Sequence, residues 1–170
     1  MILANTNYFP GLIQLYCAKL VDALKNHDYA GYDPSGTPPF NLTERHIKKV
    51  LADEIFTREV REKYFITLRL ANDDYYYIIA LLMADLYMRE GTEGYNALDI
   101  WNLACELGIA KIASLETGAL EALMEEMCEL NVFRRSISDN HCYIFSRYNF
   151  YQMLGGTLTA VEDEIARYME

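Results

Sequence analysis

The sequence predicts a mainly α-helical fold, in which a small helical bundle is followed by a winged helix-turn-helix with a small β-hairpin. Three observations support this fold class. Apolar residues recur at the spacing of amphipathic helices through most of the chain. A loop rich in glycine and proline, from Asp28 to Phe40, separates the first helix from the second. Three later helical segments are followed by two short runs of β character, which is the order of elements in a winged helix.

Residues 1–71 are expected to form the helical bundle. Pro10 stands where a helix accepts a residue without an N–H donor, and apolar residues at helical spacing continue to Leu24. Thr43 opens a short second helix, and a third helix, rich in both charges, is expected from about Thr57 to Leu70. The sequence contains no internal repeat, so we interpret these residues as one small all-helical unit.

Residues 72–154 are expected to form the winged helix, which begins with a helix from Tyr75 to Arg89. Asp73 and Asp74 precede this helix as N-cap residues and place negative charge at its N-terminus. The helix is apolar nearly all round. This pattern is typical of a helix that is buried on more than one side.

Two further helices and a hairpin complete this region. Asn96 caps a helix that Gly108 closes, and another helix runs from about Leu115 to Leu130. The two β runs are Val132 to Ile137 and Cys142 to Ser146. The four residues between them include an aspartate and an asparagine, which tolerate the left-handed conformation of a tight turn.

The charge of the chain divides near the same boundary. Residues 1–71 carry nine basic against eight acidic side chains, whereas residues 72–154 carry five against thirteen. Residues 155–170 carry one against four and include a terminal helix expected from Thr159 to Met169. The 170 residues together have a formal net charge of −10. This charge step predicts a module boundary near residue 72, and it disfavours binding of the acidic module to a polyanion.

Composition and cysteine usage indicate a globular cytoplasmic protein. The chain is 52% hydrophobic and 24% charged, which is ordinary for a folded domain. Its N-terminus lacks the basic region of a signal peptide, and no apolar run reaches the roughly 18 residues that a membrane span needs. The cysteines form no close pair and lie in apolar patterns, so we expect reduced core thiols at Cys17, Cys105, Cys128 and Cys142.

Several segments, in order along nearly the whole chain, resemble the C-terminal region of bacterial AAA/STAND-type P-loop ATPases. Thr6 to Cys17 (TNYFPGLIQLYC) looks like the start of the helical lid that follows the P-loop core, and Pro38 to Thr43 and Tyr64 to Leu70 follow in the expected order. Leu120 to Arg135 resembles the last helix and first wing strand of their winged helix, and Tyr143 to Phe150 resembles the second strand. The resemblance implies a helical lid-like bundle joined to a winged helix, both belonging to a larger ATPase.

The resemblance also implies a function without catalysis in this chain. A Gly-x-x-x-x-Gly-Lys-Ser/Thr loop is missing, and the cluster from Gly91 to Gly94 has a carboxylate where a phosphate cradle needs amides and a lysine. We therefore expect no enzyme activity and no cofactor in this chain, and a partner that is the P-loop ATPase core of the same parent protein or another protein. In such ATPases a Gly-x-Pro at the lid helix often touches the nucleotide. Because Tyr8-Phe9-Pro10 replaces it here, Pro10 is either a nucleotide contact or a plain helix-starting proline.

The residues with reactive or metal-binding side chains form no constellation in the sequence. His27, His46 and His141 lie far apart, at no spacing that a zinc site would need, and are expected to be surface or turn histidines. Cys142 follows His141 directly, but adjacent strand residues point to opposite faces and therefore make no nucleophile pair. We expect no metal site.

The candidate interaction residues lie on the last helix of the predicted winged helix. Glu121, Glu125 and Glu129 follow one another at intervals of four residues and form a single acidic stripe. No lysine or arginine occurs between Ser114 and Leu130. Since DNA phosphates would repel this stripe, the three carboxylates are candidates for a protein interface.

DNA binding through the wing is the alternative function. Arg134 and Arg135 lie in the predicted first strand of the hairpin, and Arg147 lies just after the second. Basic side chains at these positions would contact phosphates even though the preceding helix does not. The sequence leaves both hypotheses open: a protein-interaction module and a DNA-binding winged helix.

Overall fold

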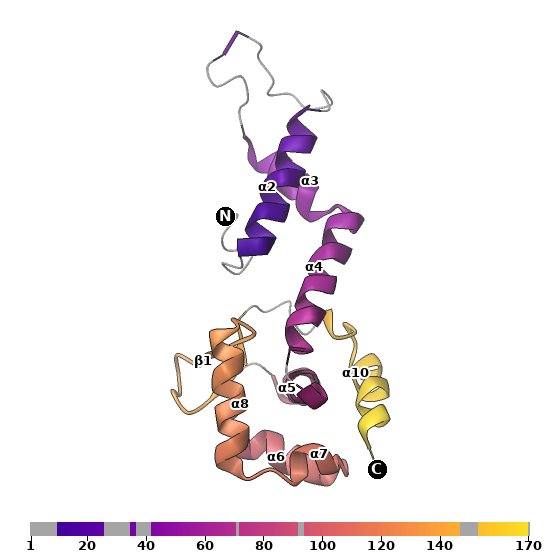
Figure 1. Cartoon of the computed structure of the whole chain (residues 1–170), viewed down its shortest axis with the longest axis vertical. Helices are drawn as coiled ribbons and strands as arrows, with labels where there is room; N and C mark the ends of the chain where they lie inside the picture. The colour runs from indigo at the N-terminus through magenta and orange to yellow at the C-terminus, as the bar shows by residue number, and fades with distance from the viewer. Residues whose placement is uncertain are drawn as a thin grey trace. The chain divides into compact units, whose positions relative to one another are not determined.

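The structure of the protein, a computed structural model, divides into two compact units, Met1–Tyr64 and Phe65–Glu170. The residues that it describes are 10–25, 35–36, 42–70, 72–91, 94–146 and 153–169 (Figure 1). These described residues form eight α-helices, two short 3-10 helices and one two-stranded antiparallel sheet. The predicted mainly helical class with a small antiparallel sheet is therefore confirmed. The expected module boundary near residue 72 stays a prediction.

The first unit contains the helices expected of the bundle. Helix α2 (Pro10–Lys25) begins at the predicted proline and is followed by α3 (Glu44–Leu51) and by α4 (Glu54–Leu68), whose residues after Tyr64 belong to the second unit. The buried side chain of Tyr16 joins them. Its hydroxyl donates to a backbone carbonyl of α3 at 3.1 Å, and its ring meets that of Phe56 in α4 edge-on, with the centroids 5.2 Å apart. One aromatic residue of α2 therefore contacts both other helices.

Side-chain caps set the starts of the two later helices. Helix α4 begins before its predicted start at Thr57, because the carboxylate of Asp53 accepts a hydrogen bond of 2.8 Å from the N–H of Phe56. At the start of α3 the N–H of Thr43 donates to Nδ1 of His46 at 2.9 Å. His46 is only 1% exposed. The expectation of a surface histidine is therefore wrong at this position, since His46 closes a capping box.

Helix α5 (Tyr75–Glu90) is the centre of the second unit. Its residues from Tyr76 to Leu86 are all buried, which confirms the prediction of a helix covered on more than one side. Figure 1 shows α5 end-on between α8 (Thr117–Glu129) and α10 (Leu158–Ile165), with α6 (Ala97–Glu106) and α7 (Ala110–Ala113) below it. The apolar core of this unit is thus built around a single helix.

The start of α5 differs from the prediction. A 3-10 turn, η1 (Asn72–Asp74), leads into it, and Asp73 and Asp74 have left-handed φ angles of +71° and +60°. Asp74 occupies the N-cap position but makes no capping hydrogen bond. Its carboxylate instead accepts from the hydroxyl of Tyr168 at 3.4 Å, and the carbonyl of Asp73 accepts from Nζ of Lys111 at 2.8 Å. The carbonyl of Asp73 and the carboxylate of Asp74 therefore contact other parts of the unit, and neither caps α5 by a side-chain hydrogen bond.

The helices after α5 show one confirmed cap and one short helix that the sequence did not predict. Asn96 caps α6 as expected, and its side chain accepts two backbone hydrogen bonds of 2.8 and 3.0 Å. The helix predicted from Leu115 begins instead at Thr117, and the short α7 precedes it. The indole N–H of Trp101 in α6 donates to the carbonyl of Ala113 at 3.1 Å. This contact joins the end of α7 to α6.

The hairpin joins a third backbone segment. Strands β1 (Phe133–Arg135) and β2 (Tyr143–Phe145) pair antiparallel, within the two runs that the sequence predicts. Tyr95 then pairs with Tyr143 through two N–H to carbonyl hydrogen bonds of 3.0 and 2.8 Å. The backbone order across this sheet is therefore Tyr95, β2, β1.

The turn between the strands uses a side chain in place of left-handed backbone. The carboxylate of Asp139 accepts from the N–H of His141 at 2.9 Å, an Asx turn. Neither Asp139 nor Asn140 has a positive φ, so the expected left-handed conformation is wrong for this turn. His141 is exposed, as predicted.

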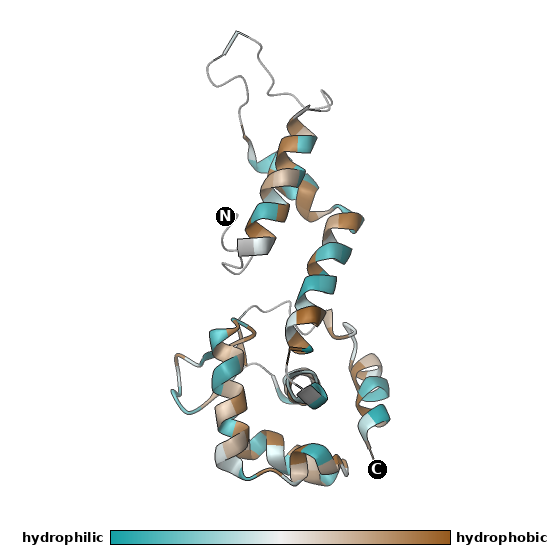
Figure 2. Ribbon diagram, viewed as in Figure 1, coloured by the Kyte–Doolittle hydropathy of each residue, from teal (hydrophilic) through white to brown (hydrophobic). Residues whose placement is uncertain are grey.

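The cysteines are free, but none lies in the core. Cys17 and Cys105 are exposed, while Cys128 and Cys142 are half-buried, so the expected burial is wrong. The apolar patterns were misleading because hydrophobic and hydrophilic residues alternate closely along the helices, as Figure 2 shows for α8. Burial still raises the pKa of the Cys128 thiol to about 11. Among the described helices, none combines the length and the apolar character of a membrane-spanning helix.

Candidate interaction surface on helix α8 and the hairpin

Helix α8 has an apolar face and an acidic side. Leu120, Met124 and Met127 are fully buried. Glu121 and Glu125 expose 52% and 46% of their side chains. Residues four positions apart lie on the same side of a helix, so these two carboxylates are neighbours. Both carboxylates lie on the side of α8 that faces Arg135 of β1.

Arg135 of β1 lies against these carboxylates. Its guanidinium forms an ion pair with Glu125, and a second one with Glu121 at an N to O distance of 3.7 Å. Its Cζ atom lies 4.1 Å from the centre of the Tyr143 ring. The hydroxyl of Tyr143 donates to Glu125 at 3.0 Å. We refer to Glu121, Glu125, Arg135 and Tyr143 as the Arg135 cluster.

The charge of Arg135 is engaged by side chains of its own unit. Its side chain is 30% exposed, and its Nη1 atom is buried without a hydrogen-bond partner among the described residues. Burial raises the pKa of Tyr143, and the nearby guanidinium offsets part of that rise. Because two carboxylates and a ring face already contact this guanidinium, a phosphate would have to compete with them for it.

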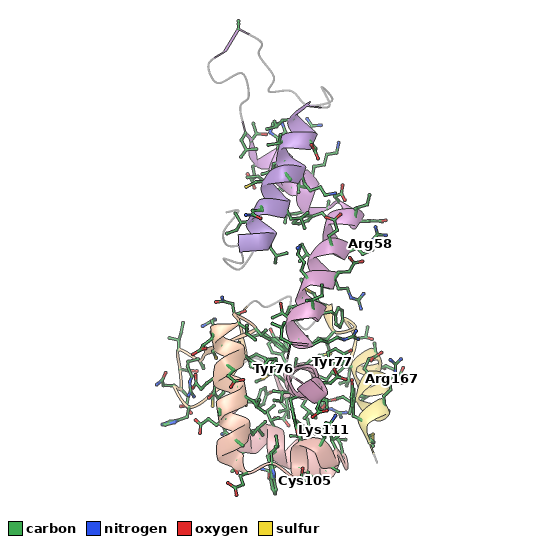
Figure 3. All side chains as sticks on the ribbon, in the orientation of Figure 1. Arg58, Tyr76, Tyr77, Cys105, Lys111 and Arg167 are labelled. Carbon is green, nitrogen blue, oxygen red and sulfur yellow. The ribbon has the colours of Figure 1, made fainter. Side chains whose placement is uncertain are left out.

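Helix α8 is also joined to α5 by a side-chain hydrogen bond. The hydroxyl of Tyr76 donates to the carboxylate of Glu126, and burial together with this bond raises the pKa of Tyr76 to about 12. The next residue, Tyr77, donates to Glu164 of α10 at 3.2 Å. Figure 3 shows Tyr76 and Tyr77 on the two sides of α5. Adjacent tyrosines thus bind the helices that flank α5.

The other predicted site residues remain apart from this cluster. Glu129 and Arg134 are exposed, and neither forms an ion pair with another described residue. Ile137, in the connection between the strands, is 92% exposed. The backbone of Pro10 begins α2. Outside the described residues lie the side chain of Pro10, Arg147 and His27.

The sequence did not predict the buried carboxylate of Asp85 or a polar groove beside it. Asp85 of α5 is 1% exposed, and its Oδ2 atom accepts from Nε of Arg89 at 2.7 Å. Arg89 also forms an ion pair with Glu162 of α10, and it lines a groove of about 620 Å³ between α5 and α6. An aspartate inside the apolar run of α5 was the signal that could have pointed to this region.

Neither a metal site among the described residues nor similarity to a known protein indicates a function for this chain. The part of the chain that the structure describes holds no group of three histidine, cysteine, aspartate or glutamate residues arranged to bind a metal ion. No protein family, curated protein or solved structure matches the chain. A functional assignment therefore rests on topology and on the placement of charge.

Proposed function

We propose that this chain is a noncatalytic protein-interaction module, the C-terminal helical lid and acidic winged helix of a larger bacterial AAA/STAND-type ATPase. The second unit docks on protein through α8. Its partner is the P-loop ATPase core of the same parent protein or another protein. The exposed carboxylate of Glu129 carries this proposal, because it has no ion-pair partner among the described residues and no basic residue occurs in α8, whereas the wing residue Arg135 is already paired with Glu121 and Glu125.

The order of elements in the second unit supports the winged helix. Helix α5 is followed by the single paired residue Tyr95, then by α6, α7 and α8, and finally by the hairpin. Tyr95 adds an isolated bridge to β2 at the edge of the two-stranded sheet. In a winged helix with this order, α8 takes the position of the recognition helix.

The charge of α8 favours protein over DNA as the partner. Glu129 is exposed, and no basic residue occurs in α8. A helix in the major groove needs donors that face base edges and phosphates. Carboxylates in that position are repelled by the phosphate backbone, which supplies most nonspecific DNA affinity. The same carboxylates attract a basic protein surface.

One observation favours the alternative of DNA binding through the wing. Arg134 lies in β1 beside Arg135, is exposed and forms no ion pair with another described residue. It is free to contact a phosphate. A single phosphate contact adds little affinity at physiological salt, so this alternative is the weaker one.

A DNA titration separates the two functions. Fluorescence anisotropy of a labelled duplex, titrated with the whole chain at physiological salt, is expected to show no binding for the native chain or for Arg134→Glu. Saturable binding that Arg134→Glu abolishes would establish the DNA-binding alternative and overturn the protein-docking proposal.

A second experiment tests the proposed partner. The reading frame upstream of Met1 is expected to encode a P-loop core, and a frame without one contradicts the ATPase assignment. We expect Glu129→Lys to weaken association of the chain with that core about tenfold by calorimetry. Asp163→Lys, the same charge reversal on the exposed side of α10, should leave the affinity unchanged. Equal effects of the two substitutions would contradict docking through α8.

A further inference from the structure

The groove between α5 and α6 combines an apolar floor with a polar rim. Leu86 of α5 and Leu103 and Leu107 at the end of α6 line its apolar part. Leu103 and Leu107 are half-buried, so they are only partly covered by other residues. A volume of about 620 Å³ is large enough for several side chains of a bound segment.

The polar rim of the groove is acidic. Glu90, Asp99 and Glu106 line it, and Glu90 and Glu106 are exposed. Asp99 is held in place, because its carboxylate accepts from the N–H of Asn96 at 2.8 Å in the capping box of α6. Three carboxylates therefore surround one opening, one of them in a fixed position.

The basic residue among the groove-lining positions does not balance these carboxylates. Arg89 is bound to Asp85 and Glu162, which together outweigh its single charge. The hydrogen bond with Asp85 and the nearby charges of Asp85, Glu162 and Glu106 raise the pKa of Arg89, so its guanidinium stays ionised. The groove thus keeps a net negative charge after its internal ion pairs are formed.

We propose that this groove is a second docking site of the unit and binds a segment of another protein that carries lysine or arginine side chains beside apolar ones. The basic side chains pair with Glu90 and Glu106 at the rim, and the apolar ones cover the leucine floor. Nucleic acid is excluded as the occupant by the same carboxylates. This inference shares with the proposed function the premise that the unit acts by binding protein. The groove itself is separate from the outward side of α8.

The probe for the test is a fluorescently labelled peptide of lysine and leucine at helical spacing, with a second peptide in which glutamate replaces lysine. Anisotropy is measured with the full chain. We expect the lysine peptide to bind and the glutamate peptide not to bind. Glu106→Lys and Glu90→Lys should each weaken binding about tenfold, whereas Asp163→Lys should change it by less than about twofold. Circular dichroism of each variant confirms that the fold is retained.

Amide chemical shifts locate the peptide and separate this inference from the α8 proposal. We expect the shifts of Leu103, Glu106 and Leu107 to move on binding, while those of Ala122 and Glu129 on α8 stay unchanged. Absence of binding, or equal losses for Glu106→Lys and Asp163→Lys, would overturn the groove as a docking site. Shifts confined to α8 would also overturn it, although docking through α8 would then be supported. If Glu129→Lys does not weaken association with the ATPase core, docking through α8 is contradicted, but the groove remains a proposed docking site.

Discussion

Arg135 and Tyr143 are direct cross-strand partners in the hairpin, and the Cζ atom of Arg135 lies 4.1 Å from the centre of the tyrosine ring. The same guanidinium pairs with Glu125 of α8, to which the tyrosine hydroxyl also donates. Arg135, a candidate DNA contact in the sequence, thus joins the hairpin to α8. Arg134, one position earlier, remains exposed.

The two adjacent arginines are a matched pair for measuring the energy of the Arg135 cluster. We expect Arg135→Met to lower the free energy of unfolding by about 1–2 kcal/mol, because it removes a cation–π contact and two ion pairs. Arg134→Met changes the net charge equally and should stay within about 0.5 kcal/mol of the native chain. Urea unfolding followed by circular dichroism measures both. Equal losses would mean that net charge, and not the cluster, sets the effect.

Two glycines test the close approach of the hairpin to the segment before α6. Gly94 and Gly91 have similar φ angles of +103° and +108°. A Cβ atom at Gly94 would lie 2.9 Å from Ile144 and 3.2 Å from the carbonyl of Tyr143, whereas one at Gly91 meets nothing within 4 Å. Both alanine variants share the backbone strain. We therefore expect Gly94→Ala to be less stable than Gly91→Ala by about 1–2 kcal/mol in thermal unfolding, and equal stabilities would contradict the packing of this segment.

The ion pair between the buried Asp85 and the partly exposed Arg89 can be tested by a double-mutant cycle. Arg89→Met leaves a carboxylate that is 1% exposed without its cation, and we expect a loss of about 2 kcal/mol in the free energy of unfolding. The loss is moderate because 45% of the Arg89 side chain is in solvent. Adding Asp85→Leu removes the unpaired charge, so the double variant should be more stable than Arg89→Met alone. A less stable double variant would show that the aspartate has another stabilising contact.

The tyrosines on either side of α5 make stability sensitive to alkaline pH. Burial is the main cause that raises the pKa values of Tyr76 and Tyr77 from 10 to about 12. The second cause is the hydrogen bond to Glu126 for Tyr76 and the negative charge of Glu164 for Tyr77. The folded chain therefore holds these protons more tightly than the unfolded chain. Stability from this source is fully present below pH 10 and is lost as the pH rises through about 12. Urea unfolding across this range should show the decline, and Tyr76→Phe should reduce its slope; an unchanged slope would exclude Tyr76 as a source.

The free thiols differ in accessibility and are expected to differ in reactivity. Cys105 is exposed (Figure 3), whereas burial raises the pKa of Cys128 to about 11. Since the thiolate is the reactive form, iodoacetamide should modify Cys105 at least about tenfold faster than Cys128. Peptide mass spectrometry of partially alkylated folded chain measures the ratio. Denatured chain is the control and should show similar rates at the two positions.

Local pattern was sufficient to predict most helices and the hairpin. The apolar run of α5 predicted its burial, because a helix that is apolar all round needs covering neighbours. Pro10 and Asn96 marked helix starts, since each acts on its own backbone or on the next turn. The short helix α7 was missed because four residues show no helical period, and its end is contacted by Trp101, which is distant in sequence.

Contacts between distant residues explain the remaining errors. His46 was expected at the surface, but its burial depends on how α3 packs against α2. The pairing of Arg135 with Glu125 requires both the register of the hairpin and its placement on α8. Neither quantity can be read from spacing along the chain. The acidic stripe and the wing arginines were therefore recognised separately, while their mutual contact was not.

The burial of α5 from Tyr76 to Leu86 has a consequence for synthesis of the chain on the ribosome. The apolar segment from Tyr76 to Leu86 leaves the exit tunnel well before Leu158–Ile165, the helix that covers one of its sides. Until α10 arrives, hydrophobic surface of α5 is open to other nascent chains. The second unit should therefore fold late, as one cooperative step, and a chain shortened before α10 should aggregate or recruit a chaperone.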